Sequence, residues 1–213
     1  MAKQPSHSWR LLRRKDHPPR NDINFIMNIV NVGYQSTNYY LIDIKGGKLL
    51  VDCGWPGTLP QFSAELKRKG IAIQDIKYLL VTHFHPDHAG LTQELKSLGI
   101  KHLLLDVQVD FISQMTEFFK TKNYPYVQIQ TDDSIRLQLR ESRKFLAGIG
   151  LTGEIIHTPG HSDDSVTLIL NEGFAFTGDL QPVFVLPEED ALSRQSWDKI
   201  HQHKIIKIFP AHG

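Results

Sequence analysis

The sequence contains a single cysteine, Cys53, among its 213 residues. One thiol cannot form a disulfide within the chain, and it cannot supply the four thiolates of a common structural zinc site. A reducing compartment is therefore expected. The chain also lacks a long apolar run, because the basic N-terminal residues precede no continuous apolar stretch and no later run could span a bilayer. We expect a cytoplasmic protein that is neither secreted nor inserted in a membrane.

The net charge is also small, since 24 lysines and arginines are balanced by 23 aspartates and glutamates to give +1. Such a balance provides no overall field to attract nucleic acid or an acidic membrane, so neither is expected as a partner. Residues 1–22 are the local exception and are interpreted as a basic N-terminal flap. With 40% apolar and 22% charged residues overall, we expect residues 23–213 to form one globular domain. A homo-oligomer is compatible with the sequence.

Apolar runs predict strands over residues 23–32, 38–44, 48–52, 78–81, 102–106, 153–158, 166–170, 173–177 and 204–209. Apolar residues at three-to-four spacing predict helices over 59–70, 88–98, 109–119, 142–150 and 192–202. Gly46 and Gly47 are typical of a hairpin turn, so the chain is expected to open with antiparallel sheet. Strand groups with interspersed helices indicate an α+β fold in which two packed sheets are flanked by helices.

Histidine is abundant, with eleven residues, and several follow a predicted strand in the segment THFHPDHAG, residues 82–90. In extended chain, residues two apart point to the same side, so His83 and His85 suit one metal ion if the strand continues through them. Pro86 biases His85 toward extended backbone, and the helix is expected to begin only after the proline. Asp87 and His88 then fall at the turn into the helix and can point to a neighbouring position. One segment thus offers two sets of ligands.

Three further candidates each come just after an apolar strand, in a turn marked by proline or glycine. His161 lies in HTPGHS, Asp179 in TGD and His212 in PAHG. Strand ends in a sandwich gather at one edge, so residues from distant parts of the sequence can meet there. Imidazole and carboxylate are ligands that zinc accepts, and a site that leaves a coordination position to water is catalytic rather than structural.

These motifs resemble the metallo-β-lactamase superfamily, whose signature is a His-x-His-x-Asp-His loop followed by a His, an Asp and a His on later strand ends. The resemblance extends from about Asn38 to His212, and its parts occur in the family's order: STNYYLI, LLVDCG, THFHPDHAG, TPGHS, TGD and PAHG. It implies a four-layer αβ/βα sandwich of two mostly antiparallel sheets flanked by helices. It also implies two zinc ions per chain, with iron or manganese as alternatives. By the family's roles, the first ion would be held by His83, His85 and His161. The second would be held by Asp87, His88 and His212, and Asp179 would bridge the two ions.

Two metal ions that share a water molecule would lower its pKa towards roughly 7 and so provide hydroxide at neutral pH. The resemblance therefore implies a zinc-dependent hydrolase of a small-molecule ester, thioester or lactone, with Asp87 as the catalytic residue that orients the water or accepts its proton. Asp179 counts against β-lactamase activity, since true β-lactamases of the superfamily generally lack that aspartate. Glyoxalase-II-like and lactonase-like members are better comparisons. However, Gln181 stands where lactonases often have tyrosine, and the sequence ends at Gly213 without the glutathione-binding extension of glyoxalase II.

Other members of the superfamily leave alternatives open. A phosphodiesterase or ribonuclease would use the same metal loop, but the near-zero charge and the lack of an evident RNA-binding arm count against it. A mononuclear persulfide dioxygenase-like oxidoreductase would use one iron on His83, His161 and Asp179. Diiron oxygen reductases usually have glutamate in place of His85, and the intact ligand set argues against a non-catalytic binding module.

The resemblance marks Asp52, in LLVDCG, as a carboxylate that orients the ligand loops. Cys53 is predicted to be a small buried residue rather than a nucleophile. His157 is expected in the core or beside the ligands, but not as a ligand. Asp163 and Asp164 predict an acidic pocket rim and a preference for neutral or cationic substrates. The other histidines lack motif context and are expected on the surface: His7, His17, His102, His201 and His203.

Overall fold

The computed structural model describes residues 27–213, so the N-terminal flap and the start of the first predicted strand lie outside the described residues. A six-stranded sheet takes its strands in sequence order from β1 to β6. β1, β2 and β3 pair antiparallel, whereas β3 to β6 pair parallel. The strands are β1 (Ile29–Asn31), β2 (Tyr40–Ile44), β3 (Gly47–Val51), β4 (Ile76–Leu80), β5 (Lys101–Leu105) and β6 (Ile135–Leu137).

A second, four-stranded sheet has the order β10-β9-β8-β7. β7, β8 and β9 pair antiparallel, and β10 pairs parallel with β9. Its strands are β7 (Gly153–His157), β8 (Val166–Leu170), β9 (Phe174–Gly178) and β10 (Lys207–Pro210). Both sheets of the described chain are therefore mixed. The antiparallel start of the chain and the mostly antiparallel four-stranded sheet agree with the expectation, whereas the six-stranded sheet corrects it, because three of its five pairings are parallel. Helical segments between consecutive strands provide the long crossovers that parallel pairing requires.

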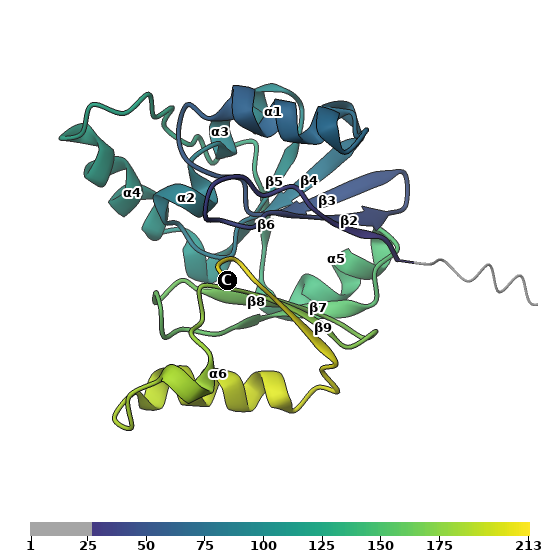
Figure 1. Cartoon of the computed structure of the whole chain (residues 1–213), viewed down its shortest axis with the longest axis vertical. Helices are drawn as coiled ribbons and strands as arrows, with labels where there is room; N and C mark the ends of the chain where they lie inside the picture. Colours follow the sequence, from purple (N-terminus) through teal and green to yellow (C-terminus); the bar gives the residue numbers. More distant parts are fainter. Residues whose placement is uncertain (1–26) are drawn as a thin grey trace, which may run out of the picture.

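Helices cover the outer face of each sheet (Figure 1). α1 to α4 lie on the six-stranded sheet and α6 lies on the four-stranded sheet, so the expected α+β sandwich with four layers is confirmed. The helices are α1 (Leu59–Arg68), α2 (Pro86–Ala89), α3 (Thr92–Ser97), α4 (Phe111–Lys120), α5 (Ser142–Gly148) and α6 (Ala191–His201). Short 3₁₀ turns are η1 (Ile73–Asp75), η2 (Asp106–Gln108), η3 (Leu139–Glu141) and η4 (Val183–Val185). In residues 27–213, no helix combines the length and apolar character needed to cross a bilayer.

Three clusters of buried apolar side chains lie between the four layers. Neighbouring residues of one strand belong to different clusters: Leu49 packs between the two sheets, whereas Leu50 packs under α1 to α4. Leu168 likewise packs between the sheets, and Ile169 packs against α6 together with Trp197. Because both faces of these strands are buried, the strands read as continuous apolar runs in the sequence.

The helix predicted over residues 88–98 is two helices, α2 and α3, separated at Gly90 and Leu91. A Cβ atom at Gly90 would lie 2.4 Å from Cδ of Pro56 and 2.5 Å from the carbonyl oxygen of Gly54. The glycine therefore allows close backbone packing against the loop after β3, and the helix changes direction there. Pro86 is the first residue of α2 rather than preceding it, since its fixed φ suits the first turn of a helix. The three-residue strand β6 was not predicted.

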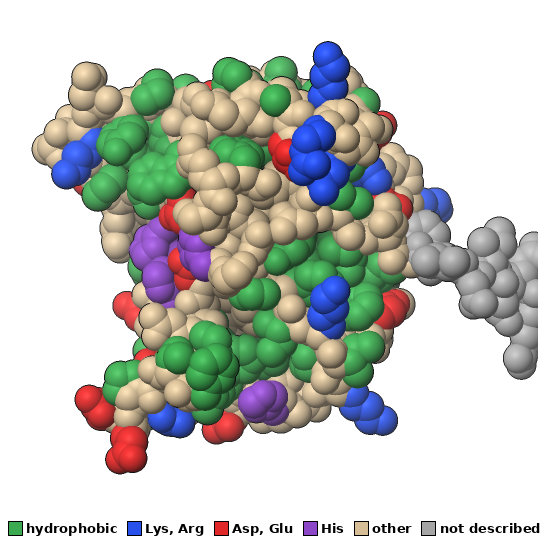
Figure 2. Space-filling view, viewed as in Figure 1, with side chains coloured by type: hydrophobic (Ala, Val, Ile, Leu, Met, Phe, Trp, Pro, Cys, Tyr) green, Lys and Arg blue, Asp and Glu red, His purple; other side chains and the backbone are tan. Residues whose placement is uncertain are grey.

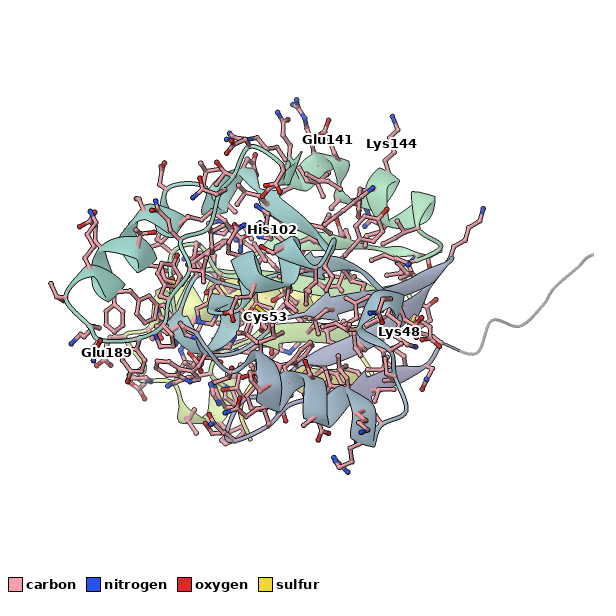
Figure 3. The ribbon with its side chains drawn as sticks, turned by 90° about the horizontal axis from the view of Figure 1, so that it is seen from above. Lys48, Cys53, His102, Glu141, Lys144 and Glu189 are labelled. Carbon is pink, nitrogen blue, oxygen red and sulfur yellow. The ribbon has the colours of Figure 1, made fainter. Side chains whose placement is uncertain are left out.

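His102 is fully buried on β5, which corrects the expectation that it lies on the surface. Its Nδ1 atom lies 3.1 Å from the hydroxyl oxygen of Ser134, and its ring meets the edge of Phe84. Burial, followed by the charge of Lys96, lowers the pKa of His102 to about 3. Figure 3 shows His102 well inside the outline of the molecule, whereas Glu141 and Lys144 lie at its edge.

His102 should therefore destabilise the fold in acid. In the unfolded state, His102 binds a proton once the pH is below an ordinary histidine pKa of about 6.5, whereas in the folded state it binds one only near pH 3. The free energy of unfolding therefore decreases as the pH is lowered from about 6.5 towards 3. We expect His102→Asn to reduce the acid-side slope of the unfolding free energy by up to about 1.4 kcal/mol per pH unit. Denaturant titrations between pH 7 and 4 measure this slope. His201→Asn, which removes an exposed histidine, is the control, and equal slopes for both variants would contradict the prediction.

Candidate metal centre

His83 and His85 follow β4 in extended chain, as the alternation of side chains predicts. His85 has φ −95° and ψ 157°, so it precedes α2 as an extended residue. Donor atoms of His83, His85 and His161 all lie within 4.8 Å of one another. Nε2 of His161 is 3.0 Å from Nδ1 of His85. Three imidazoles from two distant segments thus converge on one point.

A second group is formed by Asp87 and His88 on α2, Asp179 after β9 and His212 after β10, with donor atoms again within 4.8 Å. Figure 1 shows the end of the chain, marked C, between the six-stranded and the four-stranded sheet, on the side of α2. There, Nε2 of His212 lies 3.2 Å from Oδ2 of Asp87. The structure therefore brings together all seven residues that the sequence identified.

The carboxylate of Asp179 lies between the two groups. Its Oδ2 atom is 3.4 Å from Nε2 of His161 and 3.8 Å from Nε2 of His83. Its Oδ1 atom is 3.2 Å from Nε2 of His88 and 3.3 Å from Nε2 of His212. One oxygen thus faces each group, which is the arrangement that a bridging carboxylate requires.

The donor set fits divalent metal ions. Ligand atoms about 2.1 Å from one tetrahedral zinc ion lie about 3.4 Å apart. The separation is 3.0 Å between the nearest nitrogens of His85 and His161 and 3.8 Å between His83 and Asp179, and no pair of donor atoms within either group is more than 4.8 Å apart. Three buried atoms that point into the cluster also have no hydrogen-bond partner among the described residues: Nε2 of His83, Nε2 of His88 and Oδ1 of Asp179. Buried polar atoms are seldom left unpaired, and a cation would pair all three.

The charges in the cluster also favour a cation. Burial and the neighbouring imidazoles hold the pKa of His83 well below its ordinary value, and burial lowers the pKa of His161, so both rings are neutral and can act as ligands. Burial opposes ionisation of Asp179, but the close approach of His88, followed by the charges of His212 and His161, outweighs burial and lowers the pKa of its carboxyl group. For His88, burial is outweighed by Asp52 and Asp179, and without a cation its pKa rises to about 10.

Asp52 orients the cluster through the ring nitrogen of His88 that faces away from the other donors, as the resemblance implied. It is 2% exposed, and its Oδ2 atom lies 2.9 Å from Nδ1 of His88. Oδ1 accepts a hydrogen bond of 2.7 Å from the backbone N–H of Thr82, whose hydroxyl group also donates to the carboxylate. A carboxylate at Nδ1 holds the proton there and leaves Nε2 of His88 free to face the cluster.

Two positioning contacts were not predicted, although their residues lie in the STNYYLI motif. The hydroxyl group of Thr37 donates to Oδ2 of Asp87 over 3.1 Å, and Thr37 is buried. The carbonyl oxygen of Ser36 lies 2.8 Å from Nδ1 of His212, so Nε2 of that ring faces the cluster. Both contacts join residues far apart in sequence, so only the motif itself could have pointed to them.

A pocket of about 590 Å³ opens beside His85, Asp87 and His161, and a smaller one of about 250 Å³ lies beside His161, Asp179 and His212. In Figure 2 the histidines lie in a recess on the left of the molecule, with hydrophobic side chains above and below them. The two pockets and this recess give a ligand access to the cluster.

Asp163 and Asp164 differ in their surroundings. Asp163 is exposed and lines the larger pocket, in agreement with the expected acidic rim. Asp164 is 1% exposed, and its Oδ2 atom accepts a hydrogen bond of 2.7 Å from the backbone N–H of Phe84. Its carboxylate therefore anchors the histidine loop. Asp164 also borders the larger pocket, but as a buried, hydrogen-bonded side chain and not as an exposed charge at the rim.

His157 is half-buried at the end of β7 and lies outside the cluster, where its Nε2–H donates to the carbonyl oxygen of Asp163. Cys53 is fully buried, and its thiol donates to the carbonyl oxygen of His88. His201 is exposed and His203 is half-buried, so only the first matches the expected surface position, and His7 and His17 lie outside the described residues.

Comparison with known proteins gives matches over most of the chain. A family model for the metallo-β-lactamase superfamily matches residues 32–212. A beta-lactamase-like protein 2 homolog of Drosophila melanogaster is 30% identical over 189 residues, which cover 84% of this chain and 59% of the fly protein. A probable metallo-hydrolase of Methanocaldococcus jannaschii is 30% identical over 210 residues, which cover 88% of this chain and 92% of the archaeal protein.

A fungal match names an activity. The atrochrysone carboxyl ACP thioesterase of Aspergillus chevalieri is 29% identical over 187 residues, but this chain covers only 52% of it. Among solved structures, a metallo-β-lactamase of Cronobacter sakazakii with a mutated HARLDQ motif has a TM-score of 0.66 at 19% identity, over 87% of this chain and 77% of that one. This last likeness concerns the fold alone.

Asp52→Asn should weaken the second group of donors. Asparagine tolerates the backbone of Asp52, which has φ 62°. Its amide would present N–H to Nδ1 of His88, so the ring would carry its proton on Nε2, where a metal ion would bind. We expect the affinity for added zinc, measured by chelator competition, to fall about 10- to 100-fold. Asp198→Asn, which removes an exposed carboxylate on α6, is the matched control, and unchanged zinc affinity in both variants would refute this role of Asp52.

Cys53 should be unreactive in the folded protein. Burial raises the pKa of its thiol to about 12, and reagents attack the thiolate. Because the chain has one cysteine, a thiol titration should give no reaction in native buffer and one thiol per chain in denaturant. Rapid labelling of the native protein would show that the thiol is accessible.

Proposed function

The chain belongs to the metallo-β-lactamase superfamily, and we propose that it is a hydrolase that holds two zinc ions and cleaves ester, thioester or lactone bonds of small molecules. The observation that carries this proposal is the position of Asp179. Its two oxygens face two separate groups of donors. A site for one ion would need only one of these groups.

In this proposal the first ion would be held by His83, His85 and His161. The second would be held by Asp87, His88 and His212, and Asp179 would contribute one oxygen to each ion. Bound zinc ions would lower the pKa of water towards about 7 and polarise the carbonyl oxygen of the substrate. Overall, water adds its hydroxyl group to the carbonyl carbon, the C–O or C–S bond breaks, and the departing alcohol or thiol takes the remaining proton.

We assign a second task to Asp87, which is to orient the attacking water and to accept its proton. Asp87 lines the larger pocket, and its Oδ2 atom also faces Nε2 of His88 and of His212. Thr37 fixes the carboxylate by its hydrogen bond. The side chain is therefore held next to both the donor cluster and the space that a substrate would occupy.

The fungal relative that is named a thioesterase supports acyl transfer to water as the reaction. A phosphodiesterase or ribonuclease is favoured less, because the described residues that line the larger pocket include neither lysine nor arginine to contact phosphates. A site with a single iron is also favoured less, because the second group of donors is complete.

The test is turnover of esters, thioesters, lactones, β-lactams and phosphodiesters by protein whose zinc content is measured. We expect acyl substrates to be hydrolysed, activity to disappear with a chelator, and about two zinc ions per chain. His85→Ala should lose one ion. Asp87→Ala should lower turnover about 10²- to 10⁴-fold.

The control for both substitutions is His157→Ala, because His157 lies outside the cluster. It should retain the zinc content and the turnover of the unmodified protein. Unchanged turnover in His85→Ala and Asp87→Ala, or cleavage of phosphodiesters alone, would contradict the proposed function.

A further inference from the structure

One wall of the larger pocket is apolar. It is formed by Phe84, in the histidine loop, and by three side chains of α4: Phe111, Met115 and Phe118. Phe84 and Met115 are buried, whereas Phe118 is 46% exposed. In Figure 2, hydrophobic side chains lie directly above the recess that holds the histidines. An apolar ligand group in this pocket would remove aromatic surface from water, which is favourable in proportion to the area covered.

The charges of the larger pocket favour a neutral ligand. No lysine or arginine occurs among its lining residues in the described chain, and Asp163 contributes an exposed carboxylate. A carboxylate or phosphate at the rim of this pocket would meet the like charge of Asp163 and no lysine or arginine side chain of the described residues. The apolar wall and the negative charge at the rim therefore both favour a ligand group that is apolar and uncharged.

The smaller pocket has a different character. It shares His161 with the larger pocket and is also lined by His212, Asp179, Gln181 and the apolar residues Leu180, Pro182 and Pro210, and no phenylalanine or methionine lines it within the described residues. Gln181 is exposed, and an amide side chain can donate hydrogen bonds. Hydrolysis divides an ester or thioester into a carboxylic acid, which carries the acyl chain, and a departing alcohol or thiol. The larger, aromatic pocket suits the acyl chain, which leaves the smaller pocket, where Gln181 can donate a hydrogen bond, for the departing alcohol or thiol.

We propose that the aromatic wall on α4 makes this protein selective for neutral, apolar acyl groups, such as medium-length alkyl or aryl chains of esters and thioesters. This inference rests on the proposed hydrolase function. It adds that the acyl side of the substrate lies against Met115 and Phe118, that Asp163 disfavours acyl chains carrying a carboxylate, and that chain length on the departing side matters less.

The first test compares thioesters of one thiol with acetyl, butyryl, hexanoyl and octanoyl groups, together with an acetyl series in which the thiol is lengthened instead. We expect kcat/KM to rise about two- to fourfold per added acyl methylene until the pocket is filled. Lengthening the thiol should have a smaller effect. Equal rates across the acyl series, or a stronger dependence on the thiol, would overturn the proposal.

The second test measures binding without turnover. The chain has three methionines, two of which are among the described residues: Met115 lines the pocket, and Met27 packs against the core between the sheets. In protein labelled with ¹³C at the methionine methyl groups, 2-octanone should shift the Met115 signal and leave that of Met27 in place. Acetone and octanoate should have little effect at equal concentration. Met115→Leu assigns the signal.

Matched variants separate the pocket wall from other exposed aromatic residues. Phe118→Ala should lower kcat/KM for the octanoyl substrate about tenfold and for the acetyl substrate far less, whereas Phe184→Ala should change neither. Phe184 is 87% exposed on η4 and does not line the pocket. Asp163→Asn should raise the rate for a succinyl substrate relative to its neutral butyryl analogue about two- to fivefold.

The two tests also separate this proposal from the proposed function. If no ester or thioester is cleaved while 2-octanone still shifts Met115, the hydrolase assignment fails and the acyl pocket stands. If acyl substrates are cleaved with no preference for chain length and the Met115 signal does not move, the acyl pocket fails and the hydrolase assignment stands.

Discussion

The carboxylate of Asp52 is the interaction on which the candidate metal centre depends. Asp52 directly follows β3, and its backbone lies in the left-handed region at φ 62°. This conformation is unfavourable for residues other than glycine, although asparagine and aspartate tolerate it better than most. In return, the buried carboxylate accepts hydrogen bonds from the backbone and the hydroxyl group of Thr82 and contacts Nδ1 of His88. Asp52 thereby ties the end of β3 to the start of the histidine loop and to α2. The direction in which His88 presents Nε2 follows from this contact.

The positions of the donors could be predicted from sequence because they follow local rules. Alternation in extended chain places His83 and His85 on one side, and Pro86 begins the helix that presents Asp87 and His88. The burial of His102 and Asp164 could not be predicted in this way. Their surroundings are supplied by Ser134 and by the backbone of Phe84, and neither contact leaves a periodic pattern in the sequence.

The same distinction applies to the fold. Strands such as β2 and β8 are buried on both faces and were recognised as apolar runs. The antiparallel pairing of β2 with β3 was predicted from the Gly46-Gly47 turn, but the parallel pairing of β3 to β6 was not, because parallel and antiparallel neighbours have similar composition in a sheet covered on both sides. The break between α2 and α3 depends on Gly90 approaching the backbone of Gly54, and an amphipathic pattern carries no information about such an approach. Local periodicity therefore identifies elements, and tertiary contacts decide how they pair and end.

The donor cluster is the part of the fold in which stability and function oppose each other. Nε2 of His83 and Oδ1 of Asp179 are buried without partners among the described residues, and an unpaired buried polar atom destabilises the folded state. Apolar side chains would remove that cost. However, they would also remove the only groups here that can hold a cation between the two sheets. Because an ion that binds the folded chain stabilises it by mass action, a bound metal would offset the cost at the atoms where it arises, and folding and loading of the site become coupled.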